Sequence, residues 1–256
     1  MVKTILLTGA TSGIGKATAR ELSAMGRYRL ILTGRRKERL EALKEELIRS
    51  DKTEVHVFAF DIRDLNACKV FWDGLPDGLK QIDILINNAG LAKGLSEIHE
   101  GSFDHWEQMI DTNIKGLLYM TRLISPGMVE RKQGHIINLG STAGKETYPN
   151  GNVYNATKFA VEALTRAMRM DLYKYGIRVS SVSPGAVEET EFALVRFDGD
   201  AQRARIYDDY TPLKAKDVAE IIAFILSRPS HVNIQDVLVT STQQASSMLF
   251  DKTGRK

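Results

Sequence analysis

The sequence predicts an α/β fold, with one doubly wound parallel sheet of seven strands that carries helices on both faces. Two observations predict it. Short apolar runs rich in β-branched residues alternate with longer segments of helical periodicity, and the runs are apolar almost throughout, as in parallel strands covered on both sides. A glycine-rich turn, TGATSGIG at 8–15, directly follows the first run, where a Rossmann-like fold has its phosphate loop.

The apolar runs define the strands that we expect, and the segments between them define the helices. In chain order, the expected strands are 3–8, 29–34, 54–60, 82–88, 134–140, 177–183 and 237–241. A typical helix is expected at 37–50, where Leu40, Leu43 and Leu47 form an apolar stripe and the charged remainder faces solvent. Units of this kind have right-handed crossovers and build an open sheet.

No linker, repeat or low-complexity tract divides the chain. Residues 1–256 are therefore expected to form a single domain, which the glycine-rich turn predicts to bind a dinucleotide. Only the segment 184–212 breaks the alternation, since it is long, mixed in composition and bracketed by prolines. Such excursions in compact domains are usually functional or disordered, so we expect a substrate loop there.

Composition narrows the class of protein. Hydrophobic residues make up 43% and charged residues 26%, and the net charge of +3 comes from interleaved acids and bases, which argues against a nucleic-acid partner. No run of about 18 apolar residues predicts a membrane span, and the N-terminal run reads as a strand rather than a signal peptide. One cysteine indicates a reducing cytoplasm, and five scattered histidines have no metal-ligand spacing, so no metal is expected.

The glycine-rich turn and the end of the second strand indicate which dinucleotide is bound. Gly9, Gly13 and Gly15 permit a tight turn with close backbone approach, and the helix that follows offers free N–H groups to a phosphate. Where NAD-binding proteins of this fold carry an acid, this chain has Arg35 and Arg36. Two guanidiniums suit a 2′-phosphate, whereas at the start of an ordinary helix they would oppose its dipole. The sequence favours NADP over NAD.

The catalytic candidates come in a fixed order. NNAG at 87–90, NLGSTAG around Ser141, VYNATK with Tyr154 and Lys158, and SPGAV at 183–187 follow the glycine-rich turn. Tyr154 and Lys158 lie four residues apart, on one face of a helix, a pair that alone is typical of a solvated helix surface. The complete series resembles the short-chain dehydrogenase/reductase family over essentially the whole chain.

This resemblance implies an enzyme and assigns roles to its residues. Tyr154 would be the general acid/base, and Lys158 together with the positive nicotinamide would lower its pKa from the usual value of about 10. Ser141 would hydrogen-bond the substrate oxygen, and the backbone of Asn113 would hold a water of the proton relay. The implied cofactor contacts are Gly9, Thr11, Ser12, Gly13, Ile14, Gly15, Arg35, Arg36, Asp61, Ile62, Asn87, Tyr154, Lys158, Pro184, Gly185 and Val187.

The segments 195–200, 208–220 and 240–246 resemble one subgroup of that family, which oxidises the β-hydroxyl of serine, allo-threonine and related 3-hydroxy acids with NADP. A carboxylate substrate needs a cation, and the candidate is Arg196. The alternative for Arg196 is an ion pair with Glu188, Glu189 or Glu191, which are close in sequence.

Other functions stay open at this point. They are the reduction of another small carbonyl compound (a ketone, a sugar, a pterin or an acyl-carrier-bound β-keto ester) and a non-catalytic NADPH sensor. The helices that contain Asn113 and Tyr154 are apolar around much of their circumference. With the family resemblance, this predicts a homotetramer in which one helix face packs on the sheet and another on a symmetry mate.

Overall fold

The computed structural model describes residues 2–51 and 53–256, and a seven-stranded parallel sheet forms its centre. Its strand order is β3-β2-β1-β4-β5-β6-β9, so the chain reverses its direction of winding between β1 and β4. Each predicted strand overlaps an observed one, with ends that differ by no more than a residue or two. The strands are β1 (Lys3–Thr8), β2 (Tyr28–Gly34), β3 (Val55–Ala59), β4 (Ile84–Asn87), β5 (Gly134–Leu139), β6 (Ile177–Pro184) and β9 (Asp236–Val239).

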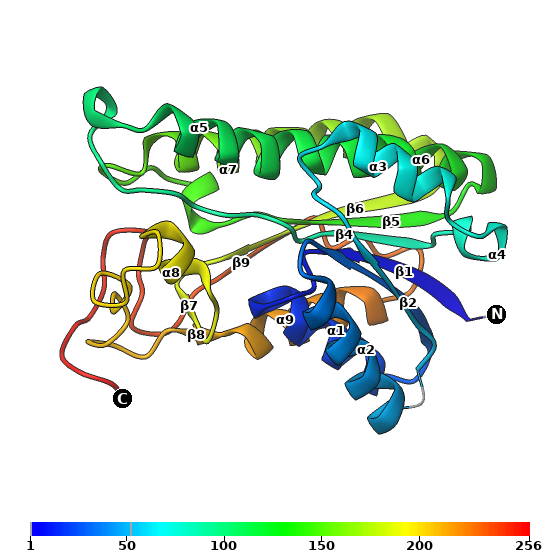
Figure 1. The fold of residues 1–256 in the computed structure, drawn as a ribbon, viewed down its shortest axis with the longest axis horizontal. Helices are drawn as coiled ribbons and strands as arrows, with labels where there is room; N and C mark the ends of the chain where they lie inside the picture. Colours follow the sequence, from blue (N-terminus) through cyan, green and yellow to red (C-terminus); the bar gives the residue numbers. More distant parts are fainter. Residues whose placement is uncertain (1, 52) are drawn as a thin grey trace.

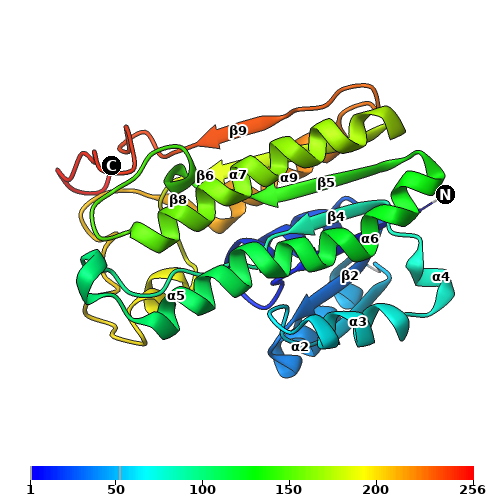
Figure 2. The same ribbon diagram turned by 90° about the horizontal axis from the view of Figure 1, so that it is seen from above.

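Helices cover both faces of the sheet, as predicted (Figure 1). One face carries α1 (Gly13–Ala24), α2 (Lys37–Asp51) and α9 (Ala215–Ser227). The other carries α3 (Leu65–Asp73), α5 (Phe103–Ile110), α6 (Leu117–Arg131) and α7 (Asn152–Leu172), and the short α4 (Asp77–Lys80) lies at the end of the sheet where β4 begins. Figure 2 shows α5 and α6 running beside α7 over the sheet, roughly along the strands. No helix among the described residues is long and apolar enough to span a membrane.

The alternation of side chains along each strand produces two hydrophobic cores. In β1, Ile5 and Leu7 belong to the core under α1, α2 and α9, and Leu6 belongs to the core under α3, α6 and α7. The predicted stripe of Leu40, Leu43 and Leu47 on α2 is buried in the first core. Helices therefore cover both faces of the sheet, and only its edges and the ends of its strands remain available for ligands.

The helical segment that contains Asn113 is interrupted. The sequence predicts one long helix, but α5 and α6 are joined by a π-helical turn at Asp111–Gly116. A π-helical turn inserts an extra residue into the helix and is frequent at functional sites. Asn113 lies within this turn and is buried.

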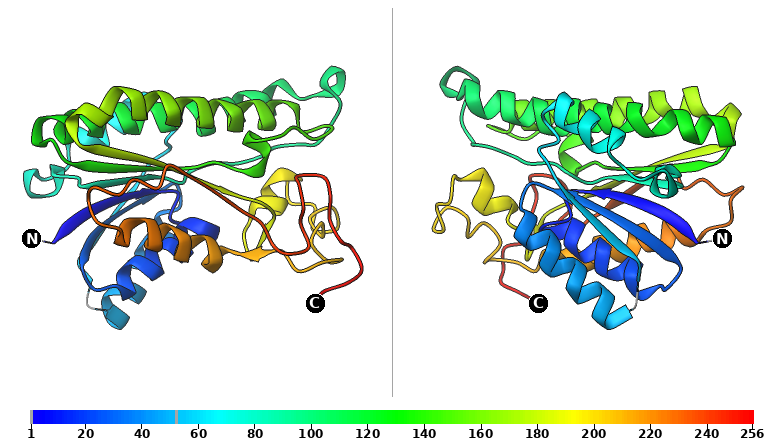
Figure 3. Two further views of the ribbon diagram at one scale, coloured as in Figure 1. Left: turned by 180° about the vertical axis from the view of Figure 1, so that it is seen from behind. Right: turned by 45° about the vertical axis from the view of Figure 1, so that its right-hand side comes forward.

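The segment after β6 has structure of its own. The two-residue strand β7 (Val187–Glu188) pairs with β8 (Leu213–Lys214), which ties the two ends of the loop together, and α8 (Phe192–Arg196) lies between them. Figure 3 shows the C-terminal segment alongside this loop. Arg255 bonds Glu188 at 2.8 Å. The C-terminal tail is therefore tied to the start of the loop, at β7.

The buried His135 gives a prediction about stability. It lies on β5 and bonds Ser180 Oγ at 2.9 Å, and burial, followed by the charges of Arg178 and Lys3, lowers its pKa to about 3. An unfolded imidazole titrates near pH 6.5. Between pH 6.5 and 3, protons therefore bind the unfolded state only, and the free energy of unfolding falls by up to about 1.4 kcal/mol per pH unit as the pH decreases.

We expect His135→Gln to lose this contribution, so that urea denaturation at pH 7 and pH 5 gives a smaller acid-induced loss of stability than in the wild type. The exposed His99 provides the control variant His99→Gln, which should behave like the wild type. An unchanged pH dependence in His135→Gln would contradict the assignment.

Candidate active site

A cleft of about 810 Å³ opens at the carboxyl ends of the central strands. In an open α/β sheet, ligands bind at this edge, at the point where the winding reverses. The cleft is lined by the glycine-rich turn, the residues that follow β4, β5 and β6, and the loop with α8. Its volume is within the range of ligand pockets.

The glycine-rich turn forms a cradle that only glycine allows. Gly9 and Gly13 have φ of +70° and +51°, and a Cβ on Gly15 would lie 2.2 Å from the carbonyl oxygen of Gly9. Ser12 precedes α1 without capping it through its side chain, and the first turn has no acidic residue. The N–H groups at the start of α1 are thus suited to the pyrophosphate of a dinucleotide.

Arginines stand at one end of the cradle. Arg36 Nη2 donates to Thr11 Oγ1 and Ser12 Oγ, both at 3.0 Å, and Arg36 Nη1 lies 2.7 Å from Glu191 Oε2. Arg35 also lines the cleft. This end carries the positive charge that a 2′-phosphate requires. Glu191 directly precedes α8, so its ion pair with Arg36 also holds the loop that contains α8 close to the glycine-rich turn.

All but one of the predicted cofactor contacts line the cleft. The exception is Asn87, whose Nδ2 donates to Thr121 Oγ1 at 3.0 Å and Asn138 Oδ1 at 2.9 Å. The Asn87 side chain points to the same face of the sheet as Leu85, toward α6, and its contact with the cofactor stays a prediction. Asn88 lines the cleft instead, and its side chain donates to the carbonyl of Thr8 at 2.9 Å.

Ser141, Tyr154 and Lys158 come together at the deep side of the cleft, and all of them are buried. Ser141 follows β5, whereas Tyr154 and Lys158 lie one turn apart on α7. Lys158 Nζ donates to the carbonyl of Leu139 at 2.8 Å and is 6.0 Å from the centre of the Tyr154 ring. A phenol, a hydroxyl and an ammonium are therefore available to a group bound here.

The protein environment shifts the pKa of both titrating groups. Burial raises the pKa of Tyr154 above its usual value, Tyr148 adds to the increase, and a hydrogen bond with Ser141 opposes it. Burial lowers the pKa of Lys158 to about 8, and Glu162 opposes that change. Without a ligand the phenol is protonated. The lowering of the Tyr154 pKa that the family resemblance implies therefore needs further positive charge in the cleft, such as the nicotinamide.

Asn113 does not line the cleft, but it fixes the segment that does. Its Oδ1 accepts from the N–H of Leu91 at 2.9 Å, and its Nδ2 donates to the Leu91 carbonyl at 2.9 Å and Thr157 Oγ1 at 3.0 Å. The side chain thus connects the chain after β4 to the catalytic helix α7.

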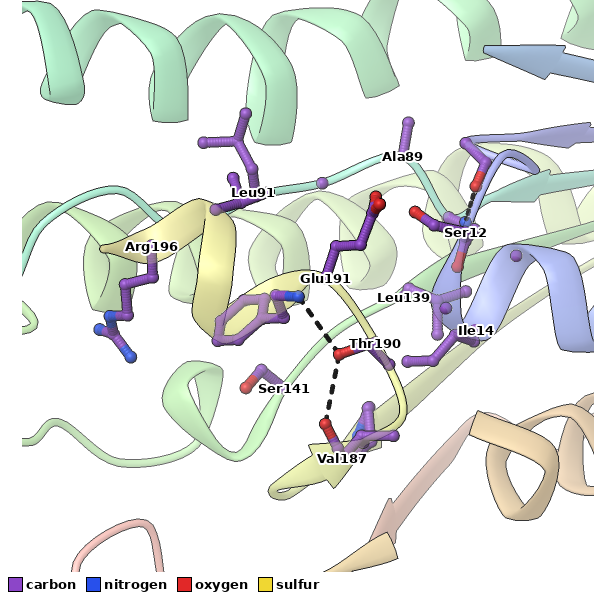
Figure 4. A pocket seen from close by; sticks show the side chains of 18 of the residues that line it. Ser12, Ile14, Ala89, Leu91, Leu139, Ser141, Val187, Thr190, Glu191 and Arg196 are labelled. Atoms are coloured by element: carbon purple, nitrogen blue, oxygen red, sulfur yellow. Dashed lines mark hydrogen bonds between the residues drawn. The ribbon is translucent and has the colours of Figure 1, made fainter. Parts of the chain in front are cut away.

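Arg196 lies at the end of α8 with only 7% of its surface exposed. Its Nη2 donates to Tyr148 Oη at 2.6 Å, its Nε donates to the Gly94 carbonyl at 3.2 Å, and its Cζ is 5.5 Å from the Tyr154 ring centre. Figure 4 shows Arg196 and Glu191 extending from the two ends of this short helix.

The alternative pairing of Arg196 with nearby acids is wrong. Glu188 pairs with Arg255 at 2.8 Å, Glu189 with Lys214 at 3.0 Å, and Glu191 with Arg36 and Arg39. Among the described residues, no carboxylate forms a salt bridge with Arg196. A buried guanidinium therefore faces the cleft beside Tyr154 without a counter-charge from the protein.

Comparisons with known proteins agree with this geometry. The model of the short chain dehydrogenase family matches residues 3–199. The NADP-dependent 3-hydroxy acid dehydrogenase YdfG of Salmonella typhimurium is 46% identical over 242 residues, which cover 94% of this chain and 96% of that protein. Sulfoacetaldehyde reductase 2 of Chromohalobacter salexigens is 45% identical over 243 residues, covering 94% of this chain and 95% of that protein.

Solved structures include close matches. The closed form of serine dehydrogenase complexed with NADP+ has a TM-score of 0.91 at 43% identity, covering 97% of this chain and 98% of that one. The serine dehydrogenase from Escherichia coli has a TM-score of 0.82 at 40% identity, covering 94% and 99%.

The three hydrogen bonds of Asn113 give a second prediction. Asn113→Ala leaves the buried backbone groups of Leu91 unpaired, so we expect the free energy of unfolding to fall by about 1–3 kcal/mol. Urea denaturation measures this loss, with Gln133→Ala as the control, because Gln133 is exposed. A variant as stable as the control would contradict the structural role.

Proposed function

The chain belongs to the short-chain dehydrogenase family, and from this premise we propose that it is an NADP-dependent oxidoreductase of small 3-hydroxy acids such as serine or allo-threonine. It would transfer hydride reversibly between the cofactor and the β-hydroxyl group. The observation that carries this proposal is the buried, unpaired Arg196 beside Tyr154. A substrate with an acid group supplies the missing counter-charge. The relatives named for 3-hydroxy acids and for serine support the same reading.

The cleft has suitable groups for each part of NADP. The cradle of Gly9, Gly13 and Gly15 would take the pyrophosphate, and Arg35 and Arg36 would take the 2′-phosphate. The adenine would lie against Asp61 and Ile62, and Pro184, Gly185 and Val187, at and after the end of β6, would form the wall beside the nicotinamide. When bound, the cofactor supplies the hydride acceptor for oxidation.

The residues of the chain then orient the substrate and move its proton. Ser141 would hydrogen-bond the substrate oxygen, and Tyr154 would accept the hydroxyl proton as the alcohol is oxidised. Lys158, with a pKa of about 8, is mostly charged at pH 7 and would stabilise the phenolate. The backbone of Asn113 would hold a water molecule of the proton relay.

The competing functions account less well for Arg196. Ketones, sugars, pterins and acyl-carrier esters place no acid group beside the reacting carbon, so the guanidinium would stay buried and unpaired. A non-catalytic NADPH sensor would have no use for Ser141, Tyr154 and Lys158 in one cluster.

A second candidate substrate class is the small sulfonates. In 3-hydroxypropionate and in 2-hydroxyethanesulfonate, one carbon separates the acid group from the carbon that carries the hydroxyl. Arg196 has donors that suit either anion. The similarity to a sulfoacetaldehyde reductase supports this candidate.

We also propose that residues 1–256 act as one domain, in the cytoplasm, within a homotetramer. The single cysteine supports a reducing compartment. Exposed apolar side chains support association, because Leu118 lies on α6 and Phe159 and Met170 lie on α7.

Tyr154→Phe tests the proposed chemistry. Removal of the phenolic oxygen eliminates the proton acceptor, so kcat for NADP-dependent oxidation of L-serine and 3-hydroxypropionate should fall at least about a hundredfold. The readout is the initial rate of NADPH formation. Tyr28→Phe, in a buried tyrosine on β2, is the control and should retain activity. A Tyr154→Phe enzyme with wild-type kcat would refute the mechanism.

Arg196→Ala tests the substrate assignment. Loss of a buried charge pair should raise KM for 3-hydroxy acids at least about thirtyfold. Arg203→Ala is the matched control, since Arg203 is exposed, is on the same loop and does not line the cleft. The assignment fails if KM for L-serine is unchanged in Arg196→Ala.

A further inference from the structure

The wall of the cleft next to Arg196 carries a second polar group to which no role has been given, the phenol of Tyr148. Tyr148 lies between the 3-10 turn Thr142–Gly144 and α7, and its side chain lines the cleft. Its Oη accepts a hydrogen bond of 2.6 Å from Arg196 Nη2. The two side chains come from segments about fifty residues apart and meet only at this wall.

The backbone around Tyr148 holds its ring in this position. The Tyr148 carbonyl accepts from Asn155 Nδ2 at 3.0 Å and from the N–H of Gly151 at 3.3 Å. A Cβ on Gly151 would lie 2.2 Å from Tyr148 Cε2, so the ring occupies space that glycine alone leaves free. The direction of the phenol is therefore fixed by the turn that precedes the catalytic helix.

The hydrogen-bond capacity of this pair is not fully used. A phenol has one hydrogen to donate, and Tyr148 Oη already acts as an acceptor toward Arg196. No acceptor for that hydrogen is present among the described residues, and Arg196 Nη1 likewise has no acceptor there. Burial raises the pKa of Tyr148, opposed by Arg196, so the phenol keeps its hydrogen at neutral pH. Two donors without acceptors thus belong to one hydrogen-bonded pair of residues that lines the cleft.

We propose that Tyr148 and Arg196 together form the subsite for the acid group of the substrate, with the phenol donating to one oxygen and the guanidinium to another. This inference rests on the proposed function, and it adds a second specificity-determining residue. A ligand that accepts a hydrogen bond from both donors is favoured over one that accepts from neither. Arg196 Cζ lies 5.4 Å from the centre of the Tyr148 ring and 5.5 Å from that of Tyr154. The subsite therefore fixes the acid group close to the catalytic phenol, and selects substrates with a short spacing between acid and hydroxyl.

Tyr148→Phe tests the proposal, because it removes only the phenolic oxygen and keeps the ring that packs on Gly151. The enzyme saturated with NADP+ is titrated with propionate, an acid without a hydroxyl, in a calorimeter. The dissociation constant of propionate should rise at least about tenfold in Tyr148→Phe, and should stay unchanged in the control Tyr28→Phe. In parallel, KM for 3-hydroxypropionate should rise by a similar factor, with kcat within about twofold of the wild type.

Unchanged propionate binding in Tyr148→Phe would overturn the proposal, as would a fall in kcat with unchanged KM, since either result places Tyr148 outside the acid subsite. Because propionate binding needs no turnover, the two hypotheses fail separately. A wild-type enzyme that binds propionate through Tyr148 but oxidises no 3-hydroxy acid would contradict the proposed function alone.

Discussion

The chemistry of this cleft depends on a positive charge that the protein buries without a protein counter-charge. Moving a guanidinium out of water is costly unless it is paired. Arg196 is only partly compensated, by Tyr148, by the Gly94 carbonyl and by the faces of Tyr148, Tyr154 and Phe192, each within 5.8 Å. The positive charge of Arg196 that remains unbalanced makes the cleft selective for an anion beside the catalytic phenol.

The position of Arg196 depends in turn on how its loop is fastened. The pairing of β7 with β8 ties the loop ends together, and Glu191 at the start of α8 bonds Arg36 and Arg39 across the glycine-rich cradle. One short helix thus joins the arginine suited to a 2′-phosphate to the arginine suited to a substrate acid. The parallel sheet supplies the frame, since the glycine-rich turn follows β1, Ser141 comes shortly after β5, and Pro184 ends β6, all at the carboxyl ends of the strands.

The sequence predicted the strands, the cradle and the cluster of Ser141, Tyr154 and Lys158, because continuous apolar runs and ordered motifs are strong signals. Asn87 lies on the same face of the sheet as Leu85 and donates to Thr121, an orientation that the alternation of side chains along β4 indicates. The π-helical turn and the two-residue strands β7 and β8 are too short to give a hydrophobic periodicity, so the sequence did not predict them. The burial of Arg196 and its contact with Tyr148 were not predictable, because acids close in sequence pair elsewhere and the contact joins distant segments.

The most direct measurement is the kcat/KM of the wild-type enzyme for 3-hydroxypropionate and for its uncharged amide, 3-hydroxypropanamide, with NADP and with NAD. A buried, unpaired Arg196 predicts that the acid is preferred over the amide by at least about thirtyfold. Arg35 and Arg36 predict that this turnover requires NADP. Equal kcat/KM for the acid and the amide would contradict the central claim, that the buried arginine selects an acid substrate.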